Sequence, residues 1–281
     1  MSKQKPLFID LFAGCGGLSL GLEQAGFAPI LVNELSDEAR SSYLMNREEL
    51  KHFQLGTVDD PKNPWIWKDV KALRKYINKN QKSFNLKVKK EFGISIAKGE
   101  LGMIVGGPPC QGFSGIGHRR SYAVDKKKIP SNHLYQDMLF LIERLKPKMF
   151  LFENVRGLLS ARWYRDSPKG EIWKDIRTEY KKRLGKDYHI GWHLVRASEY
   201  GVPQNRPRVL MVGVRKNIGW EPESNQLDDD GLLYSSMITD IHMLGVRLAR
   251  KYKLIRISYL IFLYGVIISV LHFSICHYLH I

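Results

Sequence analysis

The sequence has few cysteines, and no spacing among them is typical of a metal site. Only three occur in 281 residues, and they lie far apart at Cys15, Cys110 and Cys276. The first thirty residues also lack the cationic start and the long apolar run of a secretory leader. These absences predict an intracellular, reduced protein without zinc or another metal.

Acidic residues are scarce as well. The chain has 28 Asp and Glu against 44 Lys and Arg, a formal net charge of +16. Such an excess favours polyanionic partners through counterion release, which makes nucleic acid the leading candidate. The excess is concentrated between Lys71 and Lys98, where nine basic residues face only Glu91. This stretch fits either a solvated helical surface or a patch that contacts phosphates.

The full glycine signature of a dinucleotide-binding turn is missing too. Gly14, Gly16 and Gly17 follow an apolar strand at 7–10, but their spacing is not G-x-G-x-x-G, so a pyrophosphate cradle is not favoured. A helix with one apolar face comes next, followed by a second apolar run that ends in Glu34. In dinucleotide-binding folds, an acidic residue at the end of the second strand accepts hydrogen bonds from ribose hydroxyls.

Apolar runs bounded by Gly, Pro or charge predict three further strands, at 101–107, 148–154 and 207–214. A helix is expected at 135–147, where a proline ends it. Strands that alternate with helices predict an α/β fold with a doubly wound, mostly parallel sheet and ligand sites at the carboxyl ends of the strands. Asp10, at the end of the first strand, would then share one crevice with residues that follow the later strands.

The segment "GGPPCQGFS" presents a single thiol in stiff backbone, because proline fixes φ and glycine tolerates strained turns. Cys110 is either a small buried turn residue or a thiolate favoured by backbone donors and by Arg119 and Arg120. Glu153 ends the next strand and either caps a turn or acts as an acid toward a substrate. A nucleophile together with an acid indicates covalent catalysis on an electron-poor ring.

Five ordered segments resemble the motifs of the DNA (cytosine-5) methyltransferases of restriction-modification systems. They are "DLFAGCGGLSLGLEQAGF", "VNE", "GGPPCQGFS", "FENV" and "ASEYGVPQNRPRVLMVGVR", and the resemblance covers roughly residues 6 to 220. It implies the Rossmann-like fold of S-adenosylmethionine-dependent methyltransferases, that cofactor, and double-stranded DNA as a partner. It also implies a cytoplasmic protein in a bacterial or phage context.

The resemblance further assigns roles to single residues. The implied catalytic residues are Cys110, Glu153, Asn154, Arg206 and Arg208. Those implied to hold S-adenosylmethionine are Asp10, Phe12, Gly14, Gly16, Gly17, Glu34, Leu35, Asp69, Val70 and Pro109, of which Asp69 and Val70 are the looser match. Those implied to contact DNA are Gln111, Ser114, Arg119, Arg120 and Gln204.

The implied chemistry begins with addition of the Cys110 thiolate to C6 of cytosine while Glu153 stabilises a proton at N3. C5 then attacks the sulfonium methyl group, and loss of the C5 proton expels the cysteine without a metal. Because C5 and C6 are hidden in a stacked duplex, the base is expected to be flipped at a cost of about a few kcal/mol. The segment 112–130 would be a mobile loop that closes on the DNA.

The chain departs from the family pattern after residue 220. We expect a cofactor-binding and catalytic domain at 1–220, a linker or the start of an incomplete target recognition region at 221–240, and an apolar, basic-flanked tail at 241–281. The uncharged run at 257–276 fits a truncated or frameshifted reading frame, a membrane-associated segment, or a buried element or subunit contact; a membrane is the less favoured partner.

Two functional alternatives remain beside the methyltransferase. The family pattern usually ends with a target recognition region and two further motifs, and no counterpart of these two motifs is found after residue 220. One alternative is therefore an inactive remnant or subunit that binds nucleic acid and needs a second polypeptide to supply these motifs. The other is methylation of cytosine in tRNA, because one branch with this fold acts on RNA.

Overall fold

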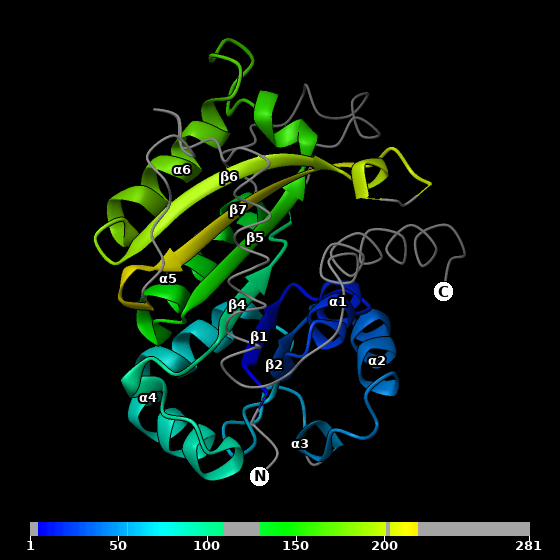
Figure 1. The fold of residues 1–281 in the computed structure, drawn as a ribbon, viewed down its shortest axis with the longest axis vertical. Helices are drawn as coiled ribbons and strands as arrows, with labels where there is room; N and C mark the ends of the chain where they lie inside the picture. The colour runs from blue at the N-terminus through cyan, green and yellow to red at the C-terminus, as the bar shows by residue number, and fades with distance from the viewer. Residues whose placement is uncertain (1–4, 55, 110–129, 201–202, 219–281) are drawn as a thin grey trace.

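A single mixed sheet organises the part of the chain that the computed structural model describes, residues 5–54, 56–109, 130–200 and 203–218. Its seven strands are arranged in the order β3-β2-β1-β4-β5-β7-β6 (Figure 1). They are β1 (Leu7–Leu11), β2 (Ala28–Asn33), β3 (Ile66–Trp67), β4 (Met103–Gly106), β5 (Met149–Val155), β6 (Tyr188–Arg196) and β7 (Pro207–Arg215). The strands from β3 to β5 are parallel, whereas β7 runs antiparallel to both β5 and β6.

Helices cover both faces of this sheet (Figure 1). The α-helices are α1 (Gly17–Gln24), α2 (Asp37–Met45), α3 (Lys51–Gln54), α4 (Val70–Phe92), α5 (Tyr135–Leu145) and α6 (Glu171–Leu184). Phe8 of β1 packs in one apolar cluster with Leu18 and Leu22 of α1. Ile9 and Leu11 point the other way and join the larger cluster to which α4, α5 and α6 contribute. This alternation follows from the twofold side-chain period of a strand.

The predicted fold class is confirmed, including the doubly wound, mostly parallel sheet. The five expected strands appear as β1, β2, β4, β5 and β7, and the expected helix is α5. β1 and β4 are buried along their whole length. Inner parallel strands are covered by helices on both faces, which explains why these segments read as continuous apolar runs.

The strand register brings the ends of four parallel strands together. Leu11, at the end of β1, lies opposite Asn33 of β2 and Gly106 of β4, and Gly106 lies opposite Phe152 of β5. Neighbouring strands are about 4.8 Å apart, so the ends of β2 and β5 are separated by about 14 Å. The segments that follow β2, β1, β4 and β5 therefore meet along one short edge of the sheet.

No helix among the described residues is long and apolar enough to cross a membrane. The uncharged run at 257–276 and the two segments expected after residue 220 lie outside the described residues.

Candidate active site

The turn after β1 has left-handed backbone at three positions, with φ of 57° at Phe12, 55° at Gly14 and 88° at Gly16. A side chain at position 16 has no room, because a Cβ atom there would lie 2.5 Å from the Tyr43 ring and 2.7 Å from Nη1 of Arg47. Glycine is required at this position by both the backbone angle and the close approach. The turn is thus pressed against the segment that follows β2.

Glu34, directly after β2, is joined to this turn by a hydrogen bond, while its predicted contact with ribose hydroxyls stays a prediction. Its Oε2 accepts a hydrogen bond from the Gly14 amide at 2.7 Å, and its Oε1 accepts one from the Ser36 amide at 2.8 Å. Its backbone carbonyl accepts from Arg40 at 2.8 Å. The neighbouring Leu35 is 66% exposed, an unusual position for a leucine. A fixed carboxylate and an exposed apolar side chain therefore stand together beside the glycine turn.

Asn33 is a site residue that the sequence analysis did not single out, although it stands inside the quoted "VNE" segment. Its Oδ1 accepts from the Phe12 amide at 3.4 Å, and its Nδ2 donates to the carbonyls of Trp67 and Lys68 at 3.3 and 3.0 Å. The buried amide thus connects the glycine turn to the segment after β3. A polar residue at the end of an otherwise apolar strand was the available signal.

Asp69 and Val70 lie at the start of α4. The Asp69 carboxylate accepts from the Lys71 amide at 2.9 Å and so caps the helix, while Val70 is buried. The Glu34 amide donates to the Trp67 carbonyl at 3.0 Å, which places the end of β3 beside Glu34. Asp69 and Val70 therefore lie along the same edge of the sheet as Glu34.

Asp10 is the most deeply buried acid at this edge, with 1% of its surface exposed. Ser19 Oγ donates to its Oδ2 at 2.6 Å and also shares a 2.8 Å hydrogen bond with the Tyr43 hydroxyl. Its Oδ1 is buried and has no hydrogen-bond partner among the described residues. Burial raises the pKa of Asp10 to about 7, an effect that the Ser19 hydrogen bond and the Arg47 charge offset only in part.

Arg47 is a second residue that sequence reasoning missed. Its guanidinium donates to both carboxylate oxygens of Glu23 at 2.7 and 2.9 Å and to the Gly16 carbonyl at 3.1 Å. It also donates to the Tyr43 carbonyl at 3.0 Å and lies 3.9 Å from the centre of the Tyr43 ring. Arg47 therefore fixes the glycine turn to α1 and to the end of α2. No motif marked it, because its role depends on contacts between segments.

The loop after β4 is held at its start by residues of β5. Asn154 Nδ2 donates to the Pro108 carbonyl at 3.0 Å, while its Oδ1 accepts from the Val155 amide at 2.9 Å. Gly107 packs so closely that an added Cβ atom would lie 2.8 Å from Oε2 of Glu153. The described part of the loop ends at the half-buried Pro109. The predicted residues that lie outside the described part are Cys110, Gln111, Ser114, Arg119 and Arg120.

Glu153 forms an ion pair with Arg208 of β7, with 2.7 Å between Oε1 and Nε. Arg208 lies opposite Val155 on the antiparallel strand, so the pair is a diagonal cross-strand contact. Burial raises the pKa of Glu153, and the charges of Arg208 and Arg206 oppose this rise. Burial and repulsion by Arg208 lower the pKa of Arg206 to about 10. The structure thus brings together Glu153 and two of the arginines that the sequence predicted.

Gln204, another predicted residue, lies two residues before Arg206, whose amide donates to the Gln204 carbonyl at 3.1 Å. Its side-chain Oε1 is buried and has no hydrogen-bond partner among the described residues. The end of β7 and the segment before it therefore place Gln204, Arg206 and Arg208 in sequence beside β5.

Comparison with known proteins shows the family to which the chain belongs. Residues 7–242 match the family described as C-5 cytosine-specific DNA methylase. The chain belongs to this family. The match includes β1 and all the strands after it, and it ends before the last part of the expected tail.

The type II methyltransferase M.DdeI of Desulfomicrobium norvegicum is 32% identical over 209 residues, which are 74% of this chain and 40% of that protein. M.NgoFVII of Neisseria gonorrhoeae, also a type II methyltransferase, is 30% identical over 236 residues, 82% of this chain and 51% of that protein. A solved Escherichia coli structure, described as a prophage-encoded DNA modification methyltransferase, has 27% identity and a TM-score of 0.50, and covers 79% of this chain and 50% of that one. The family member described here thus spans about half the length of these relatives.

Proposed function

We propose that this chain transfers a methyl group from S-adenosylmethionine to C5 of cytosine in double-stranded DNA, through a covalent bond to Cys110 and a flipped base. The observation that carries the proposal is the environment of Glu153. This carboxyl group has a raised pKa, is paired with Arg208, and lies against Gly107 in the loop that leads to Cys110. The type II relatives support a cytoplasmic role in a bacterial or phage restriction-modification system.

The residues along the sheet edge fit the cofactor. The glycine turn leaves space for close backbone approach, Glu34 offers a fixed carboxylate for hydroxyl groups, and Leu35 offers exposed apolar surface. Asp10 Oδ1, buried without a partner among the described residues, lies below the same turn. S-adenosylmethionine, when bound, supplies an electrophilic methyl group on a sulfonium centre. We assign Phe12, Gly14, Glu34 and Leu35 to its binding.

The remaining predicted cofactor residues belong to the same proposal, and they all lie at this edge of the sheet. They are Asp10, Gly16, Gly17, Asp69, Val70 and Pro109.

Glu153 is suited to hold a proton at N3 of the cytosine ring. Its raised pKa keeps the carboxyl group protonated to a higher pH than an exposed glutamate, and Arg208 fixes one of its oxygens. As the Cys110 sulfur forms its bond to C6, the C5–C6 π electrons move toward C5, and the proton at N3 stabilises the negative charge that develops on the ring. Loss of the C5 proton later re-forms the double bond and releases the thiolate.

Asn154 and the arginines have positioning roles in this proposal. Asn154 fixes the Pro108 carbonyl and so holds the start of the loop that leads to Cys110. Arg208 orients the Glu153 carboxyl group, and Arg206 lies close enough to influence its pKa. The DNA contacts proposed for Gln111, Ser114, Arg119, Arg120 and Gln204 rest on the sequence resemblance.

The proposal is tested with duplex DNA that carries 5-fluorocytosine, because fluorine at C5 cannot leave as a proton does and the cysteine adduct is trapped. The full chain with S-adenosylmethionine should form a protein–DNA band that survives denaturing electrophoresis. Cys110→Ala should abolish the band and Glu153→Gln should slow its formation. Glu199→Gln is the matched control, because this exposed glutamate pairs with Arg196 on the surface.

A second candidate function follows from the limited coverage of the relatives, 40% and 51% of the two curated proteins above. The chain would then be a nucleic-acid-binding subunit that requires a second polypeptide. Salt-sensitive DNA binding that is unchanged by Cys110→Ala, without any adduct, would favour this function. An adduct with fluorinated tRNA but not with duplex DNA would instead move the substrate to RNA.

A further inference from the structure

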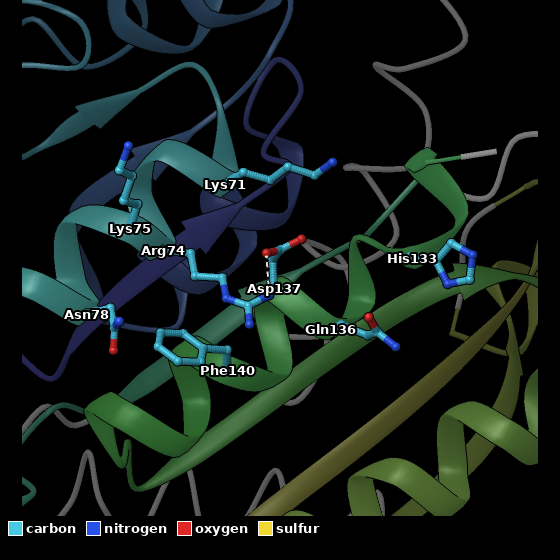
Figure 2. A pocket seen from close by; sticks show the side chains of 8 residues that line it. All are labelled: Lys71, Arg74, Lys75, Asn78, His133, Gln136, Asp137 and Phe140. Carbon is cyan, nitrogen blue, oxygen red and sulfur yellow. Dashed lines mark hydrogen bonds and ion pairs between the residues drawn. The ribbon is translucent and has the colours of Figure 1, made fainter. Parts of the chain in front are cut away.

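A groove between α4 and α5 remains unexplained by the proposed chemistry. It has a volume of about 570 Å³ and is lined by Lys71, Arg74, Lys75, Asn78, His133, Gln136, Asp137 and Phe140 (Figure 2). Three of these side chains are cationic, and one, Asp137, is an acid. The groove therefore carries a net positive charge.

The acid in the groove is already committed to one arginine. Arg74 Nη1 donates to Asp137 Oδ1 at 3.0 Å, and the Arg74 guanidinium lies 4.6 Å from the centre of the Phe140 ring (Figure 2). This pair fixes Arg74 between the two helices. Lys71 and Lys75 are exposed and form no ion pair with any described residue. They supply the uncompensated charge.

The lysines of α4 form a regular series. Lys71, Lys75 and Lys79 are exposed and follow one another at intervals of four residues, before the non-helical backbone at Asn80 interrupts the helix. Like charges at this spacing repel and destabilise a helix by about 0.2–0.5 kcal/mol per pair. Lys71 also stands in a first turn that contains no acidic residue. A bound polyanion would reduce the repulsion among these lysines and would also offset the unfavourable position of Lys71 near the positive end of the helix.

The spacing matches a nucleic-acid strand. Four residues of helix advance by about 6 Å, so three lysines span about 12 Å. Phosphates of one DNA strand advance by about 3.4 Å each along the duplex axis and wind around it, so lysines about 6 Å apart can reach more than one phosphate of the same strand. Lysine contacts of this kind are independent of base sequence.

The groove also starts at the correct edge of the sheet. α4 begins two residues after β3 ends, and α5 follows the loop after β4. The first turns of both helices therefore lie toward the edge at which Glu34, Gly107 and Glu153 gather. A duplex engaged at that edge has a direct path into the groove.

We propose that the α4–α5 groove, through Lys71 and Lys75, binds the phosphate backbone of duplex DNA outside the base that is methylated. This proposal rests on the proposed function in one respect only, which is the choice of duplex DNA as the partner. It explains the basic stretch after Asp69 as an additional phosphate-binding surface.

The test compares two double variants of the full chain with equal loss of charge. Lys71→Gln/Lys75→Gln removes the groove lysines, whereas Lys89→Gln/Lys90→Gln removes two exposed lysines from the last turn of the same helix. The nearest members of the two pairs, Lys75 and Lys89, are about 21 Å apart along the helix, well beyond the Debye length of about 8 Å at physiological salt. The dissociation constant for a labelled duplex is measured by fluorescence anisotropy from 50 to 200 mM salt, and circular dichroism confirms that both variants are folded.

We expect the groove variant to bind duplex DNA about tenfold more weakly at 150 mM salt and to reduce the slope of log K against log salt by about 2, whatever the base sequence. The control variant should change neither value substantially. Equal weakening in both variants, no weakening in the groove variant, absence of duplex binding by the wild-type chain, or an effect on tRNA alone would each overturn the proposal.

The adduct assay separates this proposal from the catalytic one. Weaker duplex binding by the groove variant, in a chain that never forms the adduct, supports the groove and contradicts the proposed catalysis. Adduct formation with unchanged binding by the groove variant supports the catalysis and contradicts the groove.

Discussion

Asp10 lies near the end of β1 and Glu153 near the end of β5, two strands that are about 10 Å apart with β4 between them. The two acids differ in what surrounds their carboxyl groups. Burial raises the pKa of both acids. Asp10 is hydrogen-bonded to the Ser19 hydroxyl, whereas Glu153 is paired with the Arg208 guanidinium. For Asp10 a neutral hydroxyl and the Arg47 charge offset burial only in part, whereas Glu153 is in direct contact with a guanidinium.

This difference distinguishes a carboxyl group that burial keeps neutral from one suited to proton transfer. A carboxyl group that exchanges a proton during a reaction needs an environment that tolerates both of its forms. The Arg208 charge provides this for Glu153, while the buried Oδ1 of Asp10 has no donor among the described residues. The comparison therefore predicts that Glu153 controls the rate and Asp10 controls the pH dependence of stability.

Glu153→Gln should give the largest effect, a loss of about 10²- to 10⁴-fold in kcat, typical of a missing general acid. Glutamine keeps the size of the side chain and can still accept from Arg208, but it cannot transfer a proton to N3 and back. Methyl transfer to duplex DNA, followed with labelled S-adenosylmethionine, measures this rate. The wild-type rate should also fall as rising pH deprotonates Glu153, and the variant should lack that dependence.

The Glu199→Gln control should retain the wild-type rate, because Glu199 pairs with Arg196 at the surface. If Glu153→Gln kept more than about a tenth of the rate while remaining folded, Glu153 would be no more than a structural partner of Arg208. The Arg208 guanidinium would then not give Glu153 a role different from that of Asp10.

Asp10→Asn should give the next largest effect, on stability. The folded protein holds the Asp10 proton up to a pH of about 7, against an ordinary pKa of 3.8. The native state therefore binds more protons than the unfolded chain between these values, and stability falls as pH rises from about 4 to about 7. The full difference corresponds to about 4 kcal/mol. Urea unfolding should show that Asp10→Asn removes this loss and is more stable than wild type at pH 8.

Asp37→Asn is the control with the opposite sign. Hydrogen bonds and charges from Lys68 and Arg40 lower the pKa of the exposed Asp37, so its contribution to stability is lost as pH falls below about 4. This variant should leave the range from pH 4 to 7 unchanged. An unaltered pH dependence in Asp10→Asn would show that Asp10 is charged in the folded protein.

The sequence predicted the parts of the site that belong to local patterns. Apolar runs located β1, β2, β4, β5 and β7, and strand ends located Glu34, Glu153 and the loop after β4. Because parallel strands of one sheet end at the same edge, these residues were expected to lie together, and the strand register confirms that the strand ends do so. Such features depend on side-chain periodicity and on turn residues, which can be read from neighbouring positions.

The residues that sequence reasoning missed act between segments distant in the chain. Arg47 follows α2 but holds Gly16 and Glu23, and Ser19 of α1 joins Asp10 to Tyr43. The pairing of Glu153 with Arg208 likewise depends on β7 lying antiparallel beside β5. Each of these contacts requires the tertiary register of two elements, which no local pattern specifies.

Arg47→Met gives the smallest of the three effects and tests whether the glycine turn depends on a buried cation. Removing the guanidinium leaves Glu23 and the Gly16 carbonyl without their donor, so we expect a loss of about 3 kcal/mol in urea unfolding. Because the Arg47 charge lowers the pKa of Asp10, the fall in stability should also continue to a higher pH than in wild type. Adding Glu23→Gln should recover part of the loss by removing the stranded carboxylate. If the double variant is as unstable as the single one, the packing of Arg47 on Tyr43 contributes more to stability than its ion pair with Glu23. The different surroundings of the Asp10 and Glu153 carboxyl groups would then not depend on the Arg47 charge.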